Sequence, residues 1–352
     1  MNKKFTKAVM NTSILILSLI LAFQISGCKK PEPIAQPPVS SEITSDEPSE
    51  PSATSSEIDA AEPSEPSAAS SEITVTDMTG REVKLTGTAE KIVVLSPSDC
   101  EILYALGAGG AVVGRGEYCD YPAEVSQVPA VQSGSETNIE QIIALNPQVV
   151  VMTKMSHSAE QVDAIENAGI RVVSTDAQNI AGVYQAIELI GKITGRDSQA
   201  SALVGEMKSG FEEIKAQAAN AGSVSDNSVY FEVSPLEWGL WTAGKNTFMD
   251  EIAQITGLKN AFDDIEGWAE ISEEQVIDRN PAYIFTITMY FEGTGQVHPV
   301  DEIAGRGGWE NIGAVKNSNI FLLDSNEISR PGPRLYEAAK KVYEIVYAGS
   351  GN

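Results

Sequence analysis

The stretch Asn138-Ile-Glu-Gln-Ile-Ile143, which runs into Asn146-Pro147 and then an apolar segment, decides the fold because it occurs twice. The second copy is Ser272-Glu-Glu-Gln-Val-Ile277, which runs into Asn280-Pro281 and another apolar segment. The copies are offset by 134 positions. Each reads as a helix that stops before its proline, because proline disfavours helical geometry in the preceding residue. The recurrence predicts two similar halves, each with a helix that leads into a strand.

Both predicted helices begin in the same way. Asn138 and Ser272 are N-cap residues followed three positions later by Gln, which predicts two capping boxes. Glu140 and Glu274 then fall in the first turn, where the helix dipole favours a carboxylate by roughly 0.3–1 kcal/mol. Two interpretations remain open: the glutamates only start helices, or they are exposed carboxylates, one per half, that dock on basic residues of a partner.

The sequence around these copies alternates strands with helices. The strand-like run 91–95 is followed by Ser-Pro, and so is 228–233 in the second half. Between the strands of the first half, Ser98–Leu106 is a predicted helix with Ser98 as its N-cap and Glu101 completing a capping box. The βαβα order predicts mostly parallel sheets that are covered on both faces.

One long helical segment separates the two halves. Residues 197–220 contain no proline and would extend about 34 Å at the usual rise per residue. We therefore expect an α/β protein with two similar lobes, 74–196 and 221–352, joined by this helix.

The N-terminus has the pattern of an export signal. Lys3, Lys4 and Lys7 precede the apolar run Ile14–Phe23, which is about half the length needed to span a bilayer. Ile25-Ser-Gly-Cys28 resembles a bacterial lipobox, which implies a signal peptide over 1–27 and a lipid on Cys28. The alternative is an ordinary signal peptide with a chance cysteine.

Residues 28–73 form a predicted tether. They are rich in Pro, Ser, Glu and Ala and carry a 15-residue repeat, in which SSEI begins at Ser40, Ser55 and Ser70. Such a segment cannot bury a core and is expected to be extended and disordered. The net charge of the chain is −25, which argues against a nucleic-acid partner.

Several strings together resemble the iron-complex and cobalamin binding-protein family of ABC importers. They are Lys91–Ser98 with Glu101–Gly107, Tyr118–Pro122, Asn138–Glu140 before Asn146-Pro147, Thr242–Gly244 with Thr247–Phe248, Gly267–Ser272, and Arg330–Arg334. The resemblance extends over residues 74 to 348 and depends on the order and spacing of the strings.

The resemblance implies a class III solute-binding protein with a ligand cleft between its lobes and only small hinge motion. It implies that Glu140 and Glu274 bind arginines of the permease, which works with ATPase subunits. We expect a monomeric, non-enzymatic protein without a cofactor of its own, anchored on the extracytoplasmic face of the cell membrane through lipid alone.

The resemblance also directs attention to the ligand. Trp268 corresponds to a cleft tryptophan of the cobalamin-binding member, while 132–137 lacks a second tryptophan found there. Trp238 and Trp241 follow the predicted strand at 228–233. Either they supply aromatic surface for a planar macrocycle from the other lobe, or they fill the lobe core. The predicted ligand is a corrinoid, and the predicted contacts are Ser98, Tyr118, Trp238, Trp241, Trp268, Tyr290 and Arg330.

Other ligands would use other residues. Arg330, after the last strand, suits an anionic ferric siderophore, because guanidinium groups pair with carboxylates. His157 and His298 follow equivalent strands and are weak candidates for axial ligation of haem, or else are loop histidines.

Other classes of function have less support. The chain has no GxSxG, P-loop or CxxC motif, so an enzyme is disfavoured. Two histidines are too few for a usual zinc receptor. A surface lipoprotein that adheres or senses remains an alternative. Cys100 and Cys119 are either a disulfide, which export permits, or two free thiols.

Overall fold

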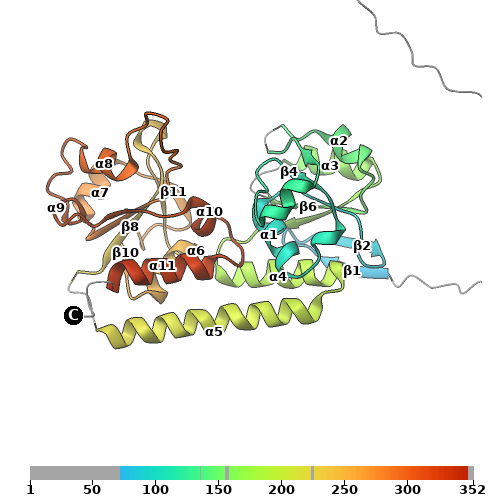
Figure 1. The fold of residues 1–352 in the computed structure, drawn as a ribbon, viewed down its shortest axis with the longest axis horizontal. Helices are drawn as coiled ribbons and strands as arrows, with labels where there is room; N and C mark the ends of the chain where they lie inside the picture. The colour runs from blue at the N-terminus through green and yellow to red at the C-terminus, as the bar shows by residue number, and fades with distance from the viewer. Residues whose placement is uncertain (1–71, 135, 155–157, 223–225, 348–352) are drawn as a thin grey trace, which may run out of the picture. The chain divides into compact units, whose positions relative to one another are not determined.

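The computed structural model describes residues 72–134, 136–154, 158–222 and 226–347. The predicted signal peptide, Cys28, nearly all of the tether and His157 lie outside these residues. The described chain forms two α/β lobes, so the predicted fold class is confirmed (Figure 1). None of the helices in these ranges is long and apolar enough to cross a lipid bilayer.

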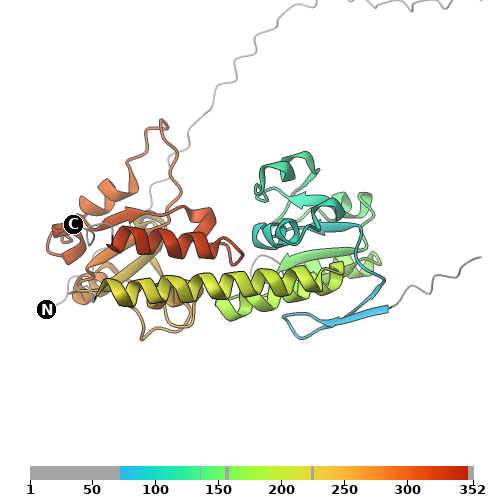
Figure 2. The ribbon, with the colours of Figure 1, turned by 60° about the horizontal axis from the view of Figure 1, so that its bottom comes forward.

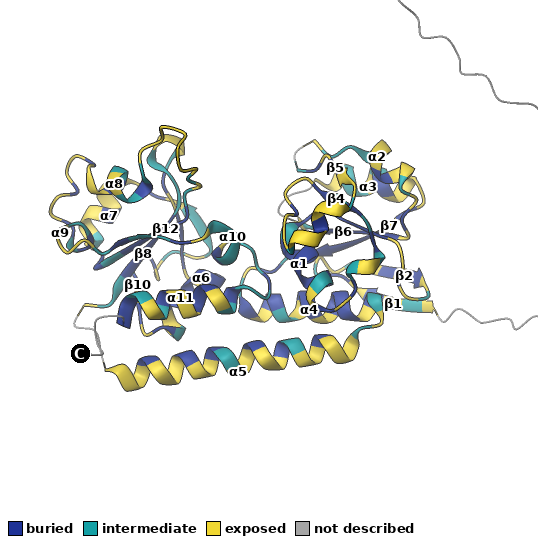
Figure 3. Ribbon diagram, in the orientation of Figure 1, coloured by how far each residue is buried: buried dark blue, intermediate teal, exposed yellow. Residues whose placement is uncertain are grey.

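The N-terminal lobe is built on a five-stranded parallel sheet in the order β5-β4-β3-β6-β7. Its central strands are continuous apolar runs, because helices cover both faces of the sheet and shield these strands from water (Figure 3). An antiparallel hairpin precedes this sheet, with Val75 paired to Val83. The strands are β1 (Glu72–Thr76), β2 (Glu82–Thr86), β3 (Ile92–Val94), β4 (Val112–Gly116), β5 (Ala130–Val131), β6 (Val149–Thr153) and β7 (Arg171–Thr175). The helices are α1 (Pro97–Ala105), α2 (Ile139–Ala144), α3 (Ala159–Asn167) and α4 (Ile180–Thr194), with 3-10 turns at Gly109–Ala111 and Ala123–Gln127.

The C-terminal lobe has a mixed sheet in the order β11-β9-β8-β12-β13, with β10 also paired to β8. The β8, β10, β12 and β13 strands are parallel, whereas β9 runs antiparallel to its neighbours. The strands are β8 (Ser228–Ser234), β9 (Trp241–Ala243), β10 (Lys259–Asn260), β11 (Trp268–Glu270), β12 (Tyr283–Thr286) and β13 (Ile320–Leu322). The helices are α6 (Phe248–Ile255), α7 (Glu273–Arg279), α8 (Pro299–Ala304), α9 (Gly313–Lys316), α10 (Ser325–Ile328) and α11 (Leu335–Tyr347), with a 3-10 turn at Leu236–Trp238.

The repeated sequence folds in the same way in both lobes. The two copies form α2 and α7, and each helix leads into a central strand of its sheet. Asn146 and Asn280, just before the two prolines, adopt left-handed φ angles of 47° and 46°. Asparagine tolerates this conformation better than most residues, which explains its presence before both prolines. The internal duplication therefore extends to backbone conformation.

The predicted helix starts are only partly correct. Ser272 and Gln275 form the full capping box, but at α2 only the Asn138 side chain caps the helix. The Gln141 side chain instead accepts a hydrogen bond from the backbone of Gln132, because the preceding chain passes within its reach. Helix α1 begins at Pro97 with Ser96 as N-cap and has no side-chain cap, so the capping box predicted at Ser98 is wrong.

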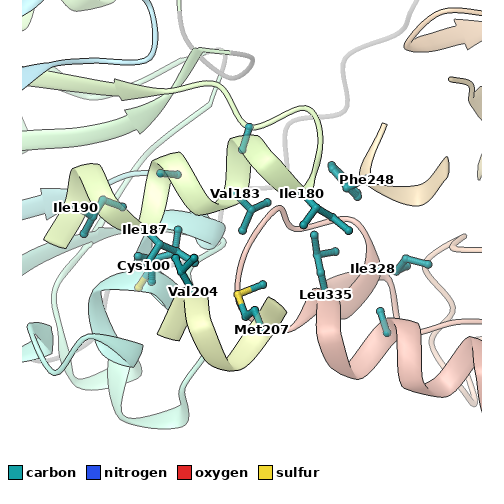
Figure 4. Close-up of a cluster of buried hydrophobic side chains, with 14 of the residues drawn as sticks. Cys100, Ile180, Val183, Ile187, Ile190, Val204, Met207, Phe248, Ile328 and Leu335 are labelled. Carbon is teal, nitrogen blue, oxygen red and sulfur yellow. The ribbon is translucent and has the colours of Figure 1, made fainter. Parts of the chain in front are cut away.

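The long helix α5 (Asp197–Ala221) connects the two lobes. It packs against α4 of the first lobe and against α6 and α11 of the second, while its outer side is exposed (Figures 2 and 3). One continuous apolar cluster contains side chains of both lobes, including Cys100 and Val183 on one side and Phe248 and Leu335 on the other (Figure 4). Because opening the lobes would pull this cluster apart, we expect only small hinge motion.

Candidate functional site

The carboxyl ends of parallel strands from both lobes lie where the lobes come together. A cavity of about 350 Å³ lies there. The N-terminal lobe lines it with the last residue of β6 and with residues just after β7, and the C-terminal lobe lines it mainly with aromatic and aliphatic side chains. The lining residues are Thr153, Ala177 and Gln178, then Val233, Ser234, Trp241, Phe248, Met249, Trp268, Ile287, Ser329 and Pro331. This largely apolar cavity lies at the ends of parallel strands and is lined by both lobes, which makes it the candidate ligand site.

Trp268 is fixed within this cavity from both lobes. Its ring packs against Phe248, with centroids 5.1 Å apart, and its indole N–H donates to the Gln178 side chain at 3.0 Å. Strand β11 positions it by antiparallel pairing with β9, which places Trp268 opposite Ala243. The indole therefore presents a partly exposed face to the cavity and links the lobes at the same time.

The other two predicted tryptophans differ from each other. Trp241 lines the same cavity and is 40% exposed. Trp238 is 74% exposed in a 3-10 turn and does not line the cavity. Neither fills the lobe core, and Trp309, which sequence reasoning did not consider, is the tryptophan that does.

Tyr290 lies in the long segment after β12, which lines two further cavities of about 360 and 370 Å³. Its ring packs edge-on against His298, with centroids 4.8 Å apart. His298 is the N-cap of α8, and its Nδ1 accepts the Val300 backbone N–H at 3.3 Å. Met289 and Phe291 on the same segment are exposed, so this side of the C-terminal lobe presents additional apolar surface.

Arg330 belongs to a cluster of charges between the lobes. Its guanidinium donates to Glu101 at 3.0 Å, to Asp120 at 2.6 Å and to the Tyr118 carbonyl at 3.4 Å. Arg334 donates to both oxygens of Glu101, at 2.9 and 2.6 Å. The pKa of Asp120 is lowered because Arg330 offsets the cost of its burial. The Arg330 charge is thus already compensated by the protein itself.

This cluster also determines where Tyr118 and Ser98 lie. The Tyr118 ring is 68% exposed, and its backbone is held by Arg330. Ser98 is buried, its hydroxyl is hydrogen-bonded to that of Ser96 at 2.8 Å, and it does not line the cavity. The structure therefore does not bring Ser98 together with the residues that line this cavity.

Two further contacts join the lobes beside the cavity. The backbone N–H of Phe248 donates to the Gln178 carbonyl at 3.0 Å. The Glu251 carboxylate of α6 accepts the Ile180 backbone N–H, at the first turn of α4, at 2.6 Å. Burial raises the pKa of Glu251. These contacts, like the ion pairs of Glu101 with Arg330 and Arg334, hold the lobes together and favour a ligand site that is largely preformed.

Asp99 is a buried acid close to this interface. It accepts a hydrogen bond from the Thr175 hydroxyl at 3.0 Å, but burial dominates and raises its pKa to about 7. A strongly shifted acid can mark a functional site or a structural one. Asp99 does not line the cavity, which indicates a structural role.

Glu140 and Glu274 are exposed at equivalent positions of α2 and α7, away from the cavity lining. The Glu274 backbone and the Ser272 hydroxyl lower the pKa of Glu274, so it is ionised at neutral pH. In the part of the chain that is described, no group of three or more His, Cys, Asp and Glu side chains is arranged to hold a metal ion.

Sequence reasoning missed several residues of this site. Gln178 lies three residues after the end of the parallel strand β7, which is a signal that could have identified it. Glu101 lies in the buried run Cys100–Leu103, and an acid there requires a partner. Phe248 belongs to one of the strings that carry the family resemblance, but it and Met249 begin a helix whose pattern is that of ordinary core.

Two α/β lobes on one long helix, with an apolar cavity at their contact, define a two-lobed solute-binding protein. The chain belongs to the periplasmic binding protein family, whose model matches residues 92–327. It is 35% identical to the uncharacterized ABC transporter substrate-binding lipoprotein YvrC of Bacillus subtilis, over 78% of this chain and 85% of the relative.

Two further relatives are similar over most of their length. A vitamin B12-binding protein of Salmonella paratyphi A is 26% identical, over 72% of this chain and 89% of its own. The structure of a possible iron-binding solute-binding protein from Staphylococcus epidermidis has a TM-score of 0.65 and 34% identity, over 74% of this chain and 99% of its own. These findings confirm the predicted class: an ABC transporter substrate-binding protein of the iron-complex and cobalamin family, which serves a permease with its ATPase and takes a small ligand.

Proposed function

We propose that the protein captures a corrinoid between its lobes and delivers it to the permease. The observation that carries this proposal is the cavity formed by Trp241, Phe248 and Trp268 against Gln178. Aromatic faces of this kind suit a large planar macrocycle better than a compact, highly charged ligand. The similarity to vitamin B12-binding proteins supports the same choice.

The charges near the cavity argue in the same direction. An anionic siderophore would require a guanidinium that is free to bind it. Arg330 and Arg334 are held by Glu101, and Lys154 is paired with Asp176 at 2.9 Å. Recruiting one of these cations for a ligand would first break its ion pair. A ligand bound mainly through its faces and amide groups avoids that cost.

The delivery step uses the two exposed glutamates. Glu140 and Glu274 occupy equivalent positions in the two lobes, and we propose that each binds a basic residue of one permease subunit. Lipid on Cys28 would hold the monomeric protein at the extracytoplasmic membrane face, with residues 28–73 as its tether. Neither glutamate lines the cavity, so docking and ligand binding can be tested separately.

Calorimetric titration with cyanocobalamin tests the ligand. Trp268→Leu removes the aromatic face and the hydrogen bond to Gln178, and we expect the Kd to rise about 10- to 30-fold. Trp238→Leu is the matched control, because Trp238 is exposed and does not line the cavity. Equal effects of the two substitutions, or no binding of cyanocobalamin by the parent protein, would contradict the proposal.

A further inference from the structure

Each proposed docking glutamate has an exposed isoleucine three residues further along its helix. Ile143 follows Glu140 in α2 and is 46% exposed, and Ile277 follows Glu274 in α7 and is 36% exposed. Residues three apart lie on one side of a helix. Each lobe therefore presents a carboxylate beside an apolar side chain (Figure 1 labels both helices).

The helices that carry these two isoleucines are anchored to the lobes by other side chains. The preceding residues, Ile142 and Val276, are fully buried and anchor their helices to the lobes. A single exposed isoleucine is ordinary and would indicate nothing. Here the same exposed side chain occurs in both copies of a repeat in which three of the six positions differ, as Asn138 differs from Ser272.

The remaining exposed apolar side chains have a different location. Among the described residues, the other large exposed ones lie in or beside the loops that follow β4, β8 and β12, at the strand ends that face the ligand cavity. They are Tyr118, Tyr121, Trp238, Trp241, Met289, Phe291 and Val297. Ile143 and Ile277 stand apart from this group, each on a helix beside its glutamate.

We propose that Ile143 and Ile277 are the apolar contacts of two equivalent docking sites for the permease. This inference rests on the proposed function, in which Glu140 and Glu274 bind basic residues of its two subunits. Each of the two permease subunits would present a basic side chain beside an apolar one. The isoleucines would exclude water from the ion pairs, and charge pairs shielded in this way are screened less by salt.

The experiment measures binding of the mature protein to its purified permease in lipid nanodiscs. Three double variants are compared: Ile143→Ser with Ile277→Ser, Ile143→Leu with Ile277→Leu, and Glu140→Ala with Glu274→Ala. From their exposure, burying each isoleucine is worth about fivefold in Kd, so we expect the serine pair to bind about 25-fold more weakly. The leucine pair should bind like the parent protein.

Two controls separate this inference from the proposed function. All variants should remain folded and bind cyanocobalamin as the parent does, because the substituted side chains lie outside the cavity. The loss in the serine pair should persist at 0.5 M salt, about the level at which exposed charges are largely screened. Unchanged permease binding by the serine pair would overturn the inference, whereas unchanged binding by the alanine pair would refute the docking role of the glutamates instead.

Discussion

Replacing Glu101 with glutamine should loosen the contact between the lobes. The Glu101 side chain is almost completely buried and accepts hydrogen bonds from Arg330 and Arg334. Glutamine has nearly the same shape but no charge, and its amide would present hydrogens to two guanidinium groups. The substitution therefore leaves two poorly solvated cations with less compensation.

The size of the effect follows from what each arginine retains. Removing one partner of a buried ion pair typically costs about 3–5 kcal/mol. Arg330 keeps Asp120 at 2.6 Å, and Arg334 keeps the Asn326 carbonyl at 3.1 Å and the Tyr121 ring at 4.3 Å. Because both arginines keep other partners, the lower end of this energy range applies. A loss of about 3 kcal/mol in the free energy of unfolding should lower the Tm by about 6–9 °C.

Thermal unfolding of Glu101→Gln, followed by circular dichroism or calorimetry, measures this change. Asp120→Asn is the matched control in the same cluster, because the Asp120 side chain is 56% exposed and its loss should cost less than about 1 kcal/mol. If Glu101→Gln lowers the Tm no more than Asp120→Asn does, the cluster does not hold the lobes together as we argue.

Three further predictions concern the buried polar groups. Folded Asp99 keeps its proton up to about pH 7, while an unfolded aspartate releases it near pH 3.8. The contribution of Asp99 to folding stability is therefore complete below about pH 4 and is lost as the pH rises to 7. Asp99→Asn should remove this pH dependence and stabilise the protein at pH 8 by up to about 4 kcal/mol, as measured by urea unfolding. Cys100 and Cys119 are buried free thiols, and the hydrogen bond between them, with burial, raises the pKa of Cys100. Peptide mapping should find both thiols unmodified by maleimide in the folded protein and both modified after unfolding without reductant. A cysteine that stays blocked after unfolding would instead reveal a disulfide. Arg306→Gln should lower the free energy of unfolding by about 3–5 kcal/mol, because it strands the buried carboxylate of Glu232, and an effect below about 1 kcal/mol would contradict that reasoning.

The fold could be predicted because its determinants are local and repeated. The Asn-Pro ends of two similar helices, the alternation of strands with helices and one long proline-free segment are all visible in sequence order. Left-handed Asn146 and Asn280 show that the repeat encodes backbone geometry as well as hydrophobic pattern. Two lobes on one connecting helix follow from these signals.

The site was predicted less completely, because its contacts join residues far apart in sequence. Glu101 fits the pattern of a capping box, yet its carboxylate is taken by Arg330 and Arg334, more than two hundred residues further along the chain. Arg330 fits an anionic ligand by its position after the last strand, but its charge is used within the protein. A local pattern identifies the type of side chain, and only the fold identifies its partner.

Residue type alone was a good guide for some positions and a poor one for others. Trp268 and Trp241 both line the cavity, as aromatic surface for a ligand would, whereas Trp238 in the 3-10 turn before β9 does not. Trp241 and Trp268 lie on the paired strands β9 and β11, whereas Trp238 lies outside both strands. On its other side, β9 pairs with β8 through a register shift between Glu232 and Ser234, for which the sequence carries no clear signal.

The most direct test of the proposed function is tryptophan-fluorescence quenching of the mature protein. Cyanocobalamin, cobinamide, haem and a panel of ferric siderophores would be titrated under identical conditions. We expect tight, saturable quenching by the two corrinoids alone, because Trp241 and Trp268 line the cavity they would occupy. Tight quenching by haem or a siderophore, with none by the corrinoids, would contradict it and place the protein in iron acquisition.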